Sequence, residues 1–161
     1  MRRPGKRSRA SVTAAAPTIE MCGIRVAETL FGIPVSHVIE ILGHQATRTV
    51  PLAPSFISGL VHYRGDVLTT ISLRHLLDLP PLARPQDILV LDGPSGQYGL
   101  VVDAVREVLT VAQSDFEPNP TTLDDRRKAL FAGTYKLPTG LLVMLDIVRL
   151  DPMQLADAEA A

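Results

Sequence analysis

Histidine and cysteine are the side chains that metal or nucleophilic chemistry would need, and in this sequence they are scattered. The histidines are His37, His44, His62 and His75, and no His-x-x-x-His or Cys/His spacing of a zinc site occurs. The single cysteine, Cys22, would need a histidine and an orienting partner to act as a nucleophile. No glycine is followed by Lys-Ser or Lys-Thr, as a phosphate-binding loop requires. We therefore expect no catalytic, metal or cofactor site, and a protein that acts by binding.

Charge and composition narrow the class of binding protein. The net charge is −1, so no overall field attracts nucleic acid. Residues 1–18 are basic and poor in apolar side chains, and we expect a disordered tail there, with weak attraction to an anionic membrane or nucleic acid as the alternative. No apolar run is long enough to span a bilayer. A single cysteine fits a reducing compartment, so the cytoplasm is expected.

The sequence contains an internal repeat. Phe31–Leu42 returns 67 positions later as Tyr98–Leu109, with glycine, two valines, glutamate and leucine unchanged. A weaker echo relates Val67–Leu73 to Leu141–Ile147. The pseudo-repeat covers about 23–77 and 88–150. Two copies of this length predict a two-lobed β domain and not a solenoid.

The elements that must position any binding residue are short strands. Alternating apolar residues and turn signals predict a hairpin at 24–35, strands at 38–42, 60–63, 67–71, 88–91, 97–102, 105–111 and 141–145, and short helices at 73–77 and 121–130. Pro34 lacks an N–H donor, so its strand lies at an edge or ends there. Residues 153–161 are expected to form a short flexible tail. Many short strands favour a barrel or a sandwich.

Several of these segments together resemble a known family. Phe31-Gly-Ile-Pro with Val38, Glu40 and Ile41, then Val50-Pro-x-x-Pro54 with Gly59, then Arg64-Gly65 and Ile71-Ser-Leu-Arg74, are similar to the CheW-like adaptor domain of bacterial chemosensory systems. The resemblance covers about 19–152. It implies a mainly β fold of two SH3-like five-stranded β-barrel subdomains with a few short helices.

The resemblance implies a non-catalytic cytoplasmic adaptor that couples chemoreceptors to a CheA-type histidine kinase. Its partners would be the cytoplasmic tip of the receptors and the regulatory domain of the kinase, so that it meets the membrane only through receptors. The positions that match the receptor groove and lobe interface are Val38, Glu40, Ile41, Gly59 and Arg64. Two departures stand out: His62-Tyr63 replaces the usual Asn-Leu, and Ser72 replaces Asp.

Two contacts are expected from this assignment. Arg64 is expected to brace Glu40 through a bidentate contact, with its remaining donors toward the partner. The kinase is expected to meet an apolar rim on edge hairpins, because edge strands expose unpaired backbone. The candidates for that rim are Val26, Leu30, Ile33, Leu91 and Leu100.

Other functions remain open on sequence grounds. The same fold forms the regulatory domain of CheA kinases, although the chain lacks kinase motifs. A CheW-like scaffold of a non-flagellar pathway, for surface motility or a second messenger, is the nearer alternative. An SH3-like nucleic-acid-binding module is a third, and near-neutral charge with 4% aromatic residues argues against it.

Overall fold

The computed structural model describes residues 17–160 except residue 46. The tail predicted to be disordered therefore lies outside the described residues, apart from Pro17 and Thr18, and Thr18 already begins the first strand. The fold is mainly β with a few short helices, as predicted. No helix in the described part of the chain has the length and apolar character needed to cross a membrane.

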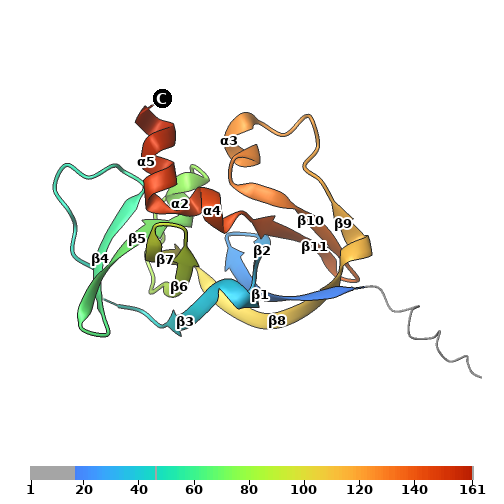
Figure 1. Ribbon diagram of the computed structural model, residues 1–161, viewed down its shortest axis with the longest axis horizontal. Helices are drawn as coiled ribbons and strands as arrows, with labels where there is room; N and C mark the ends of the chain where they lie inside the picture. Colours follow the sequence, from blue (N-terminus) through green and yellow to red (C-terminus); the bar gives the residue numbers. More distant parts are fainter. Residues whose placement is uncertain (1–16, 46, 161) are drawn as a thin grey trace, which may run out of the picture.

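In the described part of the chain, eleven strands form two sheets. The two sheets lie side by side (Figure 1). Sheet A has the order β8-β1-β2-β11-β10-β9, and sheet B has the order β3-β6-β7-β5-β4. Sheet A comprises β1 (Thr18–Val26), β2 (Thr29–Pro34), β8 (Ala104–Ala112), β9 (Phe116–Glu117), β10 (Phe131–Leu137) and β11 (Gly140–Leu145). Sheet B comprises β3 (Val38–Leu42), β4 (Ile57–Tyr63), β5 (Asp66–Ser72), β6 (Asp87–Gly93) and β7 (Gly96–Val102). The two-residue β9 gives sheet A a sixth strand where five were expected.

Short helices connect and cover the sheets. They are η2 (Val35–His37), α2 (Leu73–Leu76), η3 (Gln113–Asp115), α3 (Asp125–Lys128), α4 (Ile147–Leu150) and α5 (Pro152–Ala160). The helix expected over 121–130 is thus reduced to one turn. The expected flexible tail is instead the helix α5, because Leu155 is buried at 8% exposure and packs into the main core.

The repeat is visible element by element. Strands β1, β2 and β3 correspond to β6, β7 and β8. The elements β4, β5 and α2 correspond to β10, β11 and α4, which lie 74 positions later, so that residue 57 matches residue 131. Ser72 and Asp146 occupy equivalent positions and both cap a helix: Ser72 Oγ accepts from the His75 N–H, and Asp146 accepts from the N–H groups of Val148 and Arg149. The serine that departs from the family pattern therefore keeps the N-cap function.

The two repeats do not each form one sheet. The β1–β2 hairpin of the first repeat lies between β8 and β11 of the second, and the β6–β7 hairpin of the second repeat lies between β3 and β5 of the first. Pro34 ends β2 and is followed directly by η2, which carries the chain from sheet A to sheet B. Each sheet is therefore complete only when both halves of the chain contribute.

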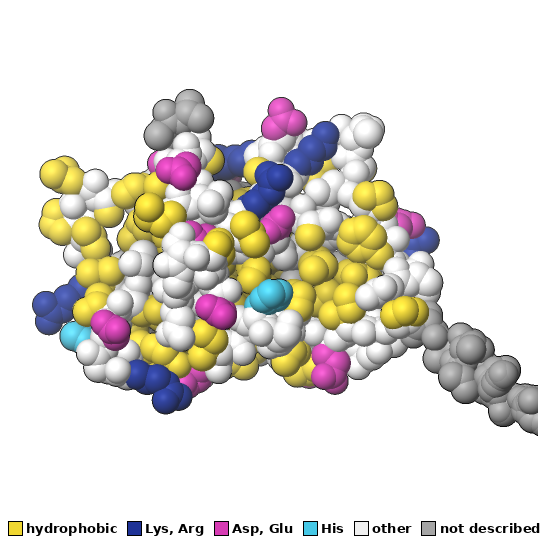
Figure 2. Space-filling view, in the orientation of Figure 1, with side chains coloured by type: hydrophobic (Ala, Val, Ile, Leu, Met, Phe, Trp, Pro, Cys, Tyr) yellow, Lys and Arg dark blue, Asp and Glu magenta, His cyan; other side chains and the backbone are white. Residues whose placement is uncertain are grey.

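The core is mainly aliphatic and joins the two sheets. One cluster combines Phe31 and Ile33 of β2 with Leu100 of β7 and Leu73 of α2, all at most 2% exposed. Burial of this apolar surface is the main source of stability. On the face seen in Figure 2, hydrophobic side chains are mixed with polar and charged ones, as on most folded proteins.

Candidate partner-binding site

The β4–β5 turn places Arg64 in an unusual conformation. Tyr63 pairs with Asp66, so Arg64 and Gly65 form a two-residue hairpin loop. Their φ angles are 51° and 79°, both in the left-handed region that such loops require. Glycine adopts this conformation freely, but a residue with a Cβ atom does so at a cost of about 1–2 kcal/mol. Arginine is therefore not at this position for the benefit of the turn.

Arg64, Glu40 and Tyr63 form one hydrogen-bonded cluster. Arg64 Nη2 donates to Glu40 Oε1 over 2.6 Å, and Nε donates to the same oxygen over 3.2 Å. The Tyr63 hydroxyl donates to Glu40 Oε1 over 2.9 Å and accepts from Arg64 Nε over 2.9 Å. The expected pair is present, and two nitrogens of Arg64 bind Glu40, both on the same oxygen.

Charge stabilisation within the cluster follows from this geometry. The hydrogen bonds from Arg64 and then from Tyr63 lower the pKa of Glu40 below its ordinary value. The hydrogen bond to Glu40 and the contact with Tyr63 raise the pKa of Arg64 further above its already high value. Both Glu40 and Arg64 are therefore charged at physiological pH. It is also largely open to solvent, with side chains 72% exposed for Arg64 and 36% for Glu40.

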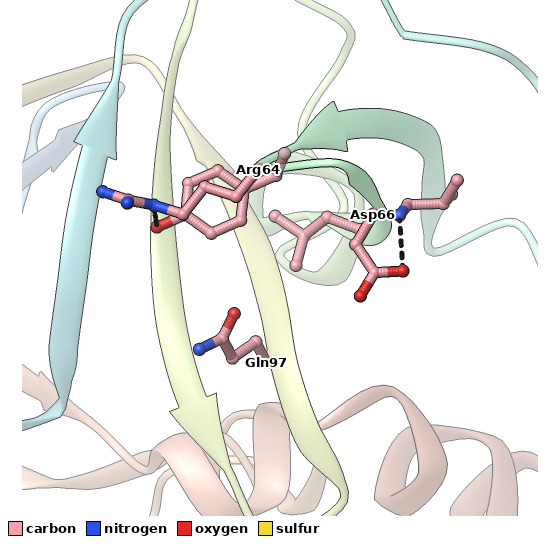
Figure 3. A pocket seen from close by; sticks show the side chains of 6 residues that line it. Arg64, Asp66 and Gln97 are labelled. Atoms are coloured by element: carbon pink, nitrogen blue, oxygen red, sulfur yellow. Dashed lines mark hydrogen bonds between the residues drawn. The ribbon is translucent and has the colours of Figure 1, made fainter.

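The cluster connects the two outer strands of sheet B. Glu40 lies on β3 and Tyr63 ends β4, and these strands are at opposite ends of the sheet order. Beside it lies an open hollow of about 350 Å³, lined by Tyr63, Arg64, Asp66, Val67, Leu68 and Gln97 (Figure 3). A charged pair next to a hollow with an exposed Val67 suits contact with an amphipathic partner.

Strand β3 divides the other predicted receptor residues between two environments. Val38 is partly buried and packs against the main core, whereas Ile41 is 49% exposed. Ile39 is exposed as well, next to a bulge between Val38 and Glu40. Ile39 was not predicted as a contact residue, although alternation along Val38–Leu42 places it on the same face of the strand as Ile41.

Gly59 has a structural reason to be glycine. Its φ is 154°, and a Cβ atom there would lie 2.7 Å from the backbone oxygen of Arg48. That oxygen accepts the Leu60 N–H, so the close approach holds the β3–β4 loop against β4. The equivalent Gly133 has φ 152° and is approached by the Phe116 ring in the same way. Gly59 therefore shapes the site through the backbone and offers no side chain of its own.

Four of the five predicted kinase-contact side chains are buried. Val26, Ile33, Leu91 and Leu100 are at most 1% exposed and belong to the main core. The reason is topological: the β1–β2 and β6–β7 hairpins, which carry these residues, are central in their sheets, so neither offers an unpaired edge. The expectation of an exposed rim is thus wrong for these four. Only Leu30 is partly exposed, and it packs against the smaller core cluster of sheet A that contains Met21 and Tyr135.

A buried ion pair escaped the sequence reasoning. Arg74 binds Asp103 with two parallel hydrogen bonds of 2.7 and 2.9 Å, and both side chains are nearly buried, at 12% and 8% exposure. Asp103 also accepts the Ala27 N–H of the β1–β2 turn, and Arg74 donates to the Pro80 carbonyl. Burial alone would raise the pKa of Asp103, but the bonds from Arg74 and Ala27 outweigh it and the pKa is lowered. The pair therefore links the β1–β2 hairpin of sheet A to the segment that follows β5 of sheet B.

The scattered histidines and the cysteine stay apart in the fold. All four histidines are exposed, and His75 Nε2 lies 3.0 Å from Ser55 Oγ. Cys22 is buried, and burial raises the pKa of its thiol. Within residues 17–160, residue 46 excepted, no three His, Cys, Asp or Glu side chains group to hold a metal ion.

Comparison with known proteins agrees with this architecture. The chain is 27% identical to the chemotaxis protein CheW of Rhizobium meliloti (strain 1021), over 86% of the chain and 91% of the relative. It is 30% identical to protein FrzA of Myxococcus xanthus, over 70% and 71%. The crystal structure of the scaffolding protein TtCheW from Thermoanaerobacter tengcongensis superposes with a TM-score of 0.75 at 25% identity, over 83% of this chain and 92% of that one. Because the model of the CheW-like domain matches residues 20–153 of the 161, the chain belongs to the CheW-like family.

Proposed function

We propose that this protein is a non-catalytic adaptor that couples chemoreceptors to a CheA-type histidine kinase. The observation that carries the proposal is the family match over residues 20–153, on a fold that agrees with a CheW scaffolding protein. The adaptor acts on the cytoplasmic side of the membrane and reaches it through the receptors. Its work is to hold two partners together.

The receptor is proposed to bind at the corner of sheet B where Glu40 and Arg64 meet. The exposed side chains of Ile39, Ile41 and Val67 supply apolar contact, and the charged pair supplies orientation. Val38 supports this strand from the core side, and Gly59 fixes the neighbouring loop. This division of roles follows from what each side chain exposes.

The kinase regulatory domain is proposed to meet the β1–β2 hairpin around Leu30. Leu30 is the candidate with some exposed surface, while Val26 and Ile33 hold the hairpin from beneath. Leu30→Glu, examined by kinase binding and by a thermal melt, separates contact from packing. Lost binding at an unchanged melting temperature supports the contact, whereas unfolding places Leu30 in the core.

The experiment that tests the receptor contact is Arg64→Lys, compared with Arg64→Ala in receptor-dependent activation of the kinase. Two nitrogens of Arg64 act together on Glu40 and Tyr63, and a lysine ammonium cannot reproduce that planar arrangement. We expect Arg64→Lys to impair activation nearly as much as Arg64→Ala, with both variants folded, because the pair is exposed. Wild-type activation by Arg64→Lys would show that charge alone suffices.

A matched control is Arg126→Lys. Arg126 binds Asp78 through one nitrogen, in another solvent-exposed pair that lies outside the proposed receptor site. We expect this variant to activate the kinase like wild type. Bacterial strains that carry these variants can also be compared in soft-agar swimming and in surface spreading, to distinguish a flagellar pathway from a surface-motility pathway.

A further inference from the structure

Tyr63 is the residue of the site that the family pattern does not account for. The usual leucine at this place would fill the core and offer no polar atom. Here the ring fills the core with Leu68, Val90 and Leu42, and the side chain is only 8% exposed. Its hydroxyl nevertheless reaches the surface and takes part in both halves of the Glu40–Arg64 pair.

Because the Tyr63 ring is held in the core, its hydroxyl has a fixed position, and it can restrict the movement of the exposed Glu40–Arg64 pair. An exposed arginine loses side-chain entropy when it is held in one geometry, so an isolated exposed pair opens readily. The Tyr63 hydroxyl binds Nε, the nitrogen nearest the backbone, and the guanidinium carbon lies 5.3 Å from the centre of the Tyr63 ring. The guanidinium is thereby tied to a side chain whose own rotamer is set by the core.

The consequence is a defined set of partner-facing atoms. Glu40 Oε1 receives all three donors of the cluster. Among the hydrogen bonds of the described residues, none reaches Glu40 Oε2 or Arg64 Nη1. Glu40 Oε2 and Arg64 Nη1 are therefore left available to a partner, beside the hollow that Val67 and Gln97 help to line (Figure 3).

We propose that Tyr63 is a positioning residue of the receptor site: its hydroxyl holds the Arg64 guanidinium on one oxygen of Glu40, so that the other oxygen and Nη1 face the partner. The inference deepens the proposed function and rests on it for the identity of the partner. Affinity is gained because the site is ordered before the partner arrives.

The test is Tyr63→Phe, which removes the hydroxyl and keeps the ring. The matched control is Tyr135→Phe, because Tyr135 is also a buried ring, lies on β10 of sheet A, and its hydroxyl has no partner among the hydrogen bonds of the described residues. Two quantities are measured for each variant. One is the pKa of Glu40 in the free protein, from the carboxyl carbon resonance, at a temperature well below both melting points. The other is the Kd for a soluble chemoreceptor-tip fragment in the presence of the kinase, both from the protein's own organism.

We expect Tyr63→Phe to raise the pKa of Glu40 toward its ordinary value, since one of its donors is gone. We expect the Kd to rise roughly three- to tenfold, the worth of one hydrogen bond. Tyr135→Phe is expected to change neither quantity.

The outcomes separate the two proposals. An unchanged Glu40 pKa overturns the positioning role, even if receptor binding weakens, because Tyr63 then acts by direct contact. An unchanged Kd beside a raised pKa also overturns it, provided that Arg64→Ala weakens binding. If Arg64→Ala binds the fragment like wild type, the receptor contact itself fails, while the Glu40 titration still reports whether Tyr63 holds the pair.

Discussion

At the scale of single residues, Arg64 is held in a backbone conformation that glycine would adopt at no cost. Its φ of 51° belongs to a two-residue loop, and the residue that follows is already glycine. A residue kept in an unfavourable conformation at an exposed turn calls for a functional reason. The side chain supplies that reason, because it forms the charged cluster with Glu40 and Tyr63.

We therefore expect Arg64→Gly to separate stability from function. Removal of the side chain relieves the left-handed strain, so the melting temperature should stay the same or rise, while receptor-dependent kinase activation should be lost. The control is Leu52→Gly, which relieves a similar φ of 65° at a residue that belongs to neither proposed contact. A melt and a kinase assay on both variants check this. A clear fall in the melting temperature of Arg64→Gly would mean that the cluster itself stabilises the fold.

Part of this site could be predicted from sequence and part could not. Glu40 and Arg64 stood out through an ordered series of motifs, and the structure brings them together. Tyr63 stood out only as a departure from the family pattern, and its role was not predicted, because an aromatic residue that ends a strand is indistinguishable from core packing until the position of its hydroxyl is known. That position depends on how β3 approaches the end of β4, across a sheet whose other strands lie between them. A long-range closure of this kind leaves no local pattern in the chain.

At the scale of elements, the Arg74–Asp103 pair decides how the exchanged hairpin is held. It joins the segment after β5 to the bend between β7 and β8, and Asp103 also binds the turn of the β1–β2 hairpin. Asp103→Asn removes the charge and leaves a nearly buried arginine without its partner. We expect a loss of about 3–5 kcal/mol in the free energy of unfolding at pH 7.

The pH dependence of this loss has a definite sign. The pKa of Asp103 is lowered in the folded protein, so its contribution is fully present above the unfolded value, which is about 3.9 for aspartate. The contribution disappears as the pH falls through the lower folded value. Urea unfolding of wild type and Asp103→Asn should therefore differ strongly at pH 7 and converge in acid. A gap that stays constant to low pH would show that the carboxylate charge is not what stabilises the pair.

At the scale of the whole molecule, the repeat was readable from the sequence and the exchange of hairpins was not. Equivalent strands have similar apolar patterns, so the β1–β2 and β6–β7 hairpins fit either sheet on hydrophobicity alone. The connections make the choice. Three residues, 35–37, join β2 to β3, and a single residue, 103, joins β7 to β8.

Those lengths rule out a sheet made from one repeat. In such a sheet β3 would lie beside β1, parallel to β2 and two strands away, which is about 10 Å across. The chain would also have to return along the length of the strand, and a parallel connection of this kind normally takes a dozen residues or more. Because the available connections are so short, each hairpin is forced into the sheet of the other repeat.

This architecture predicts that neither half of the chain folds alone. Residues 17–82 contain the central hairpin of sheet A and the strands β3, β4 and β5 of sheet B, and residues 83–161 contain the other strands. Each half lacks the neighbours that bury its apolar faces, so we expect each fragment to be largely unfolded by circular dichroism. Mixing the two should restore β structure, and the intact chain should unfold in one calorimetric transition, since the main core spans both sheets. A fragment that folded as a stable monomer, or two separate transitions in the whole protein, would contradict the interdependence of the sheets. In the expected case, a change in one sheet also affects the other, so contacts made at the Glu40–Arg64 corner and at the β1–β2 hairpin share a single folded unit.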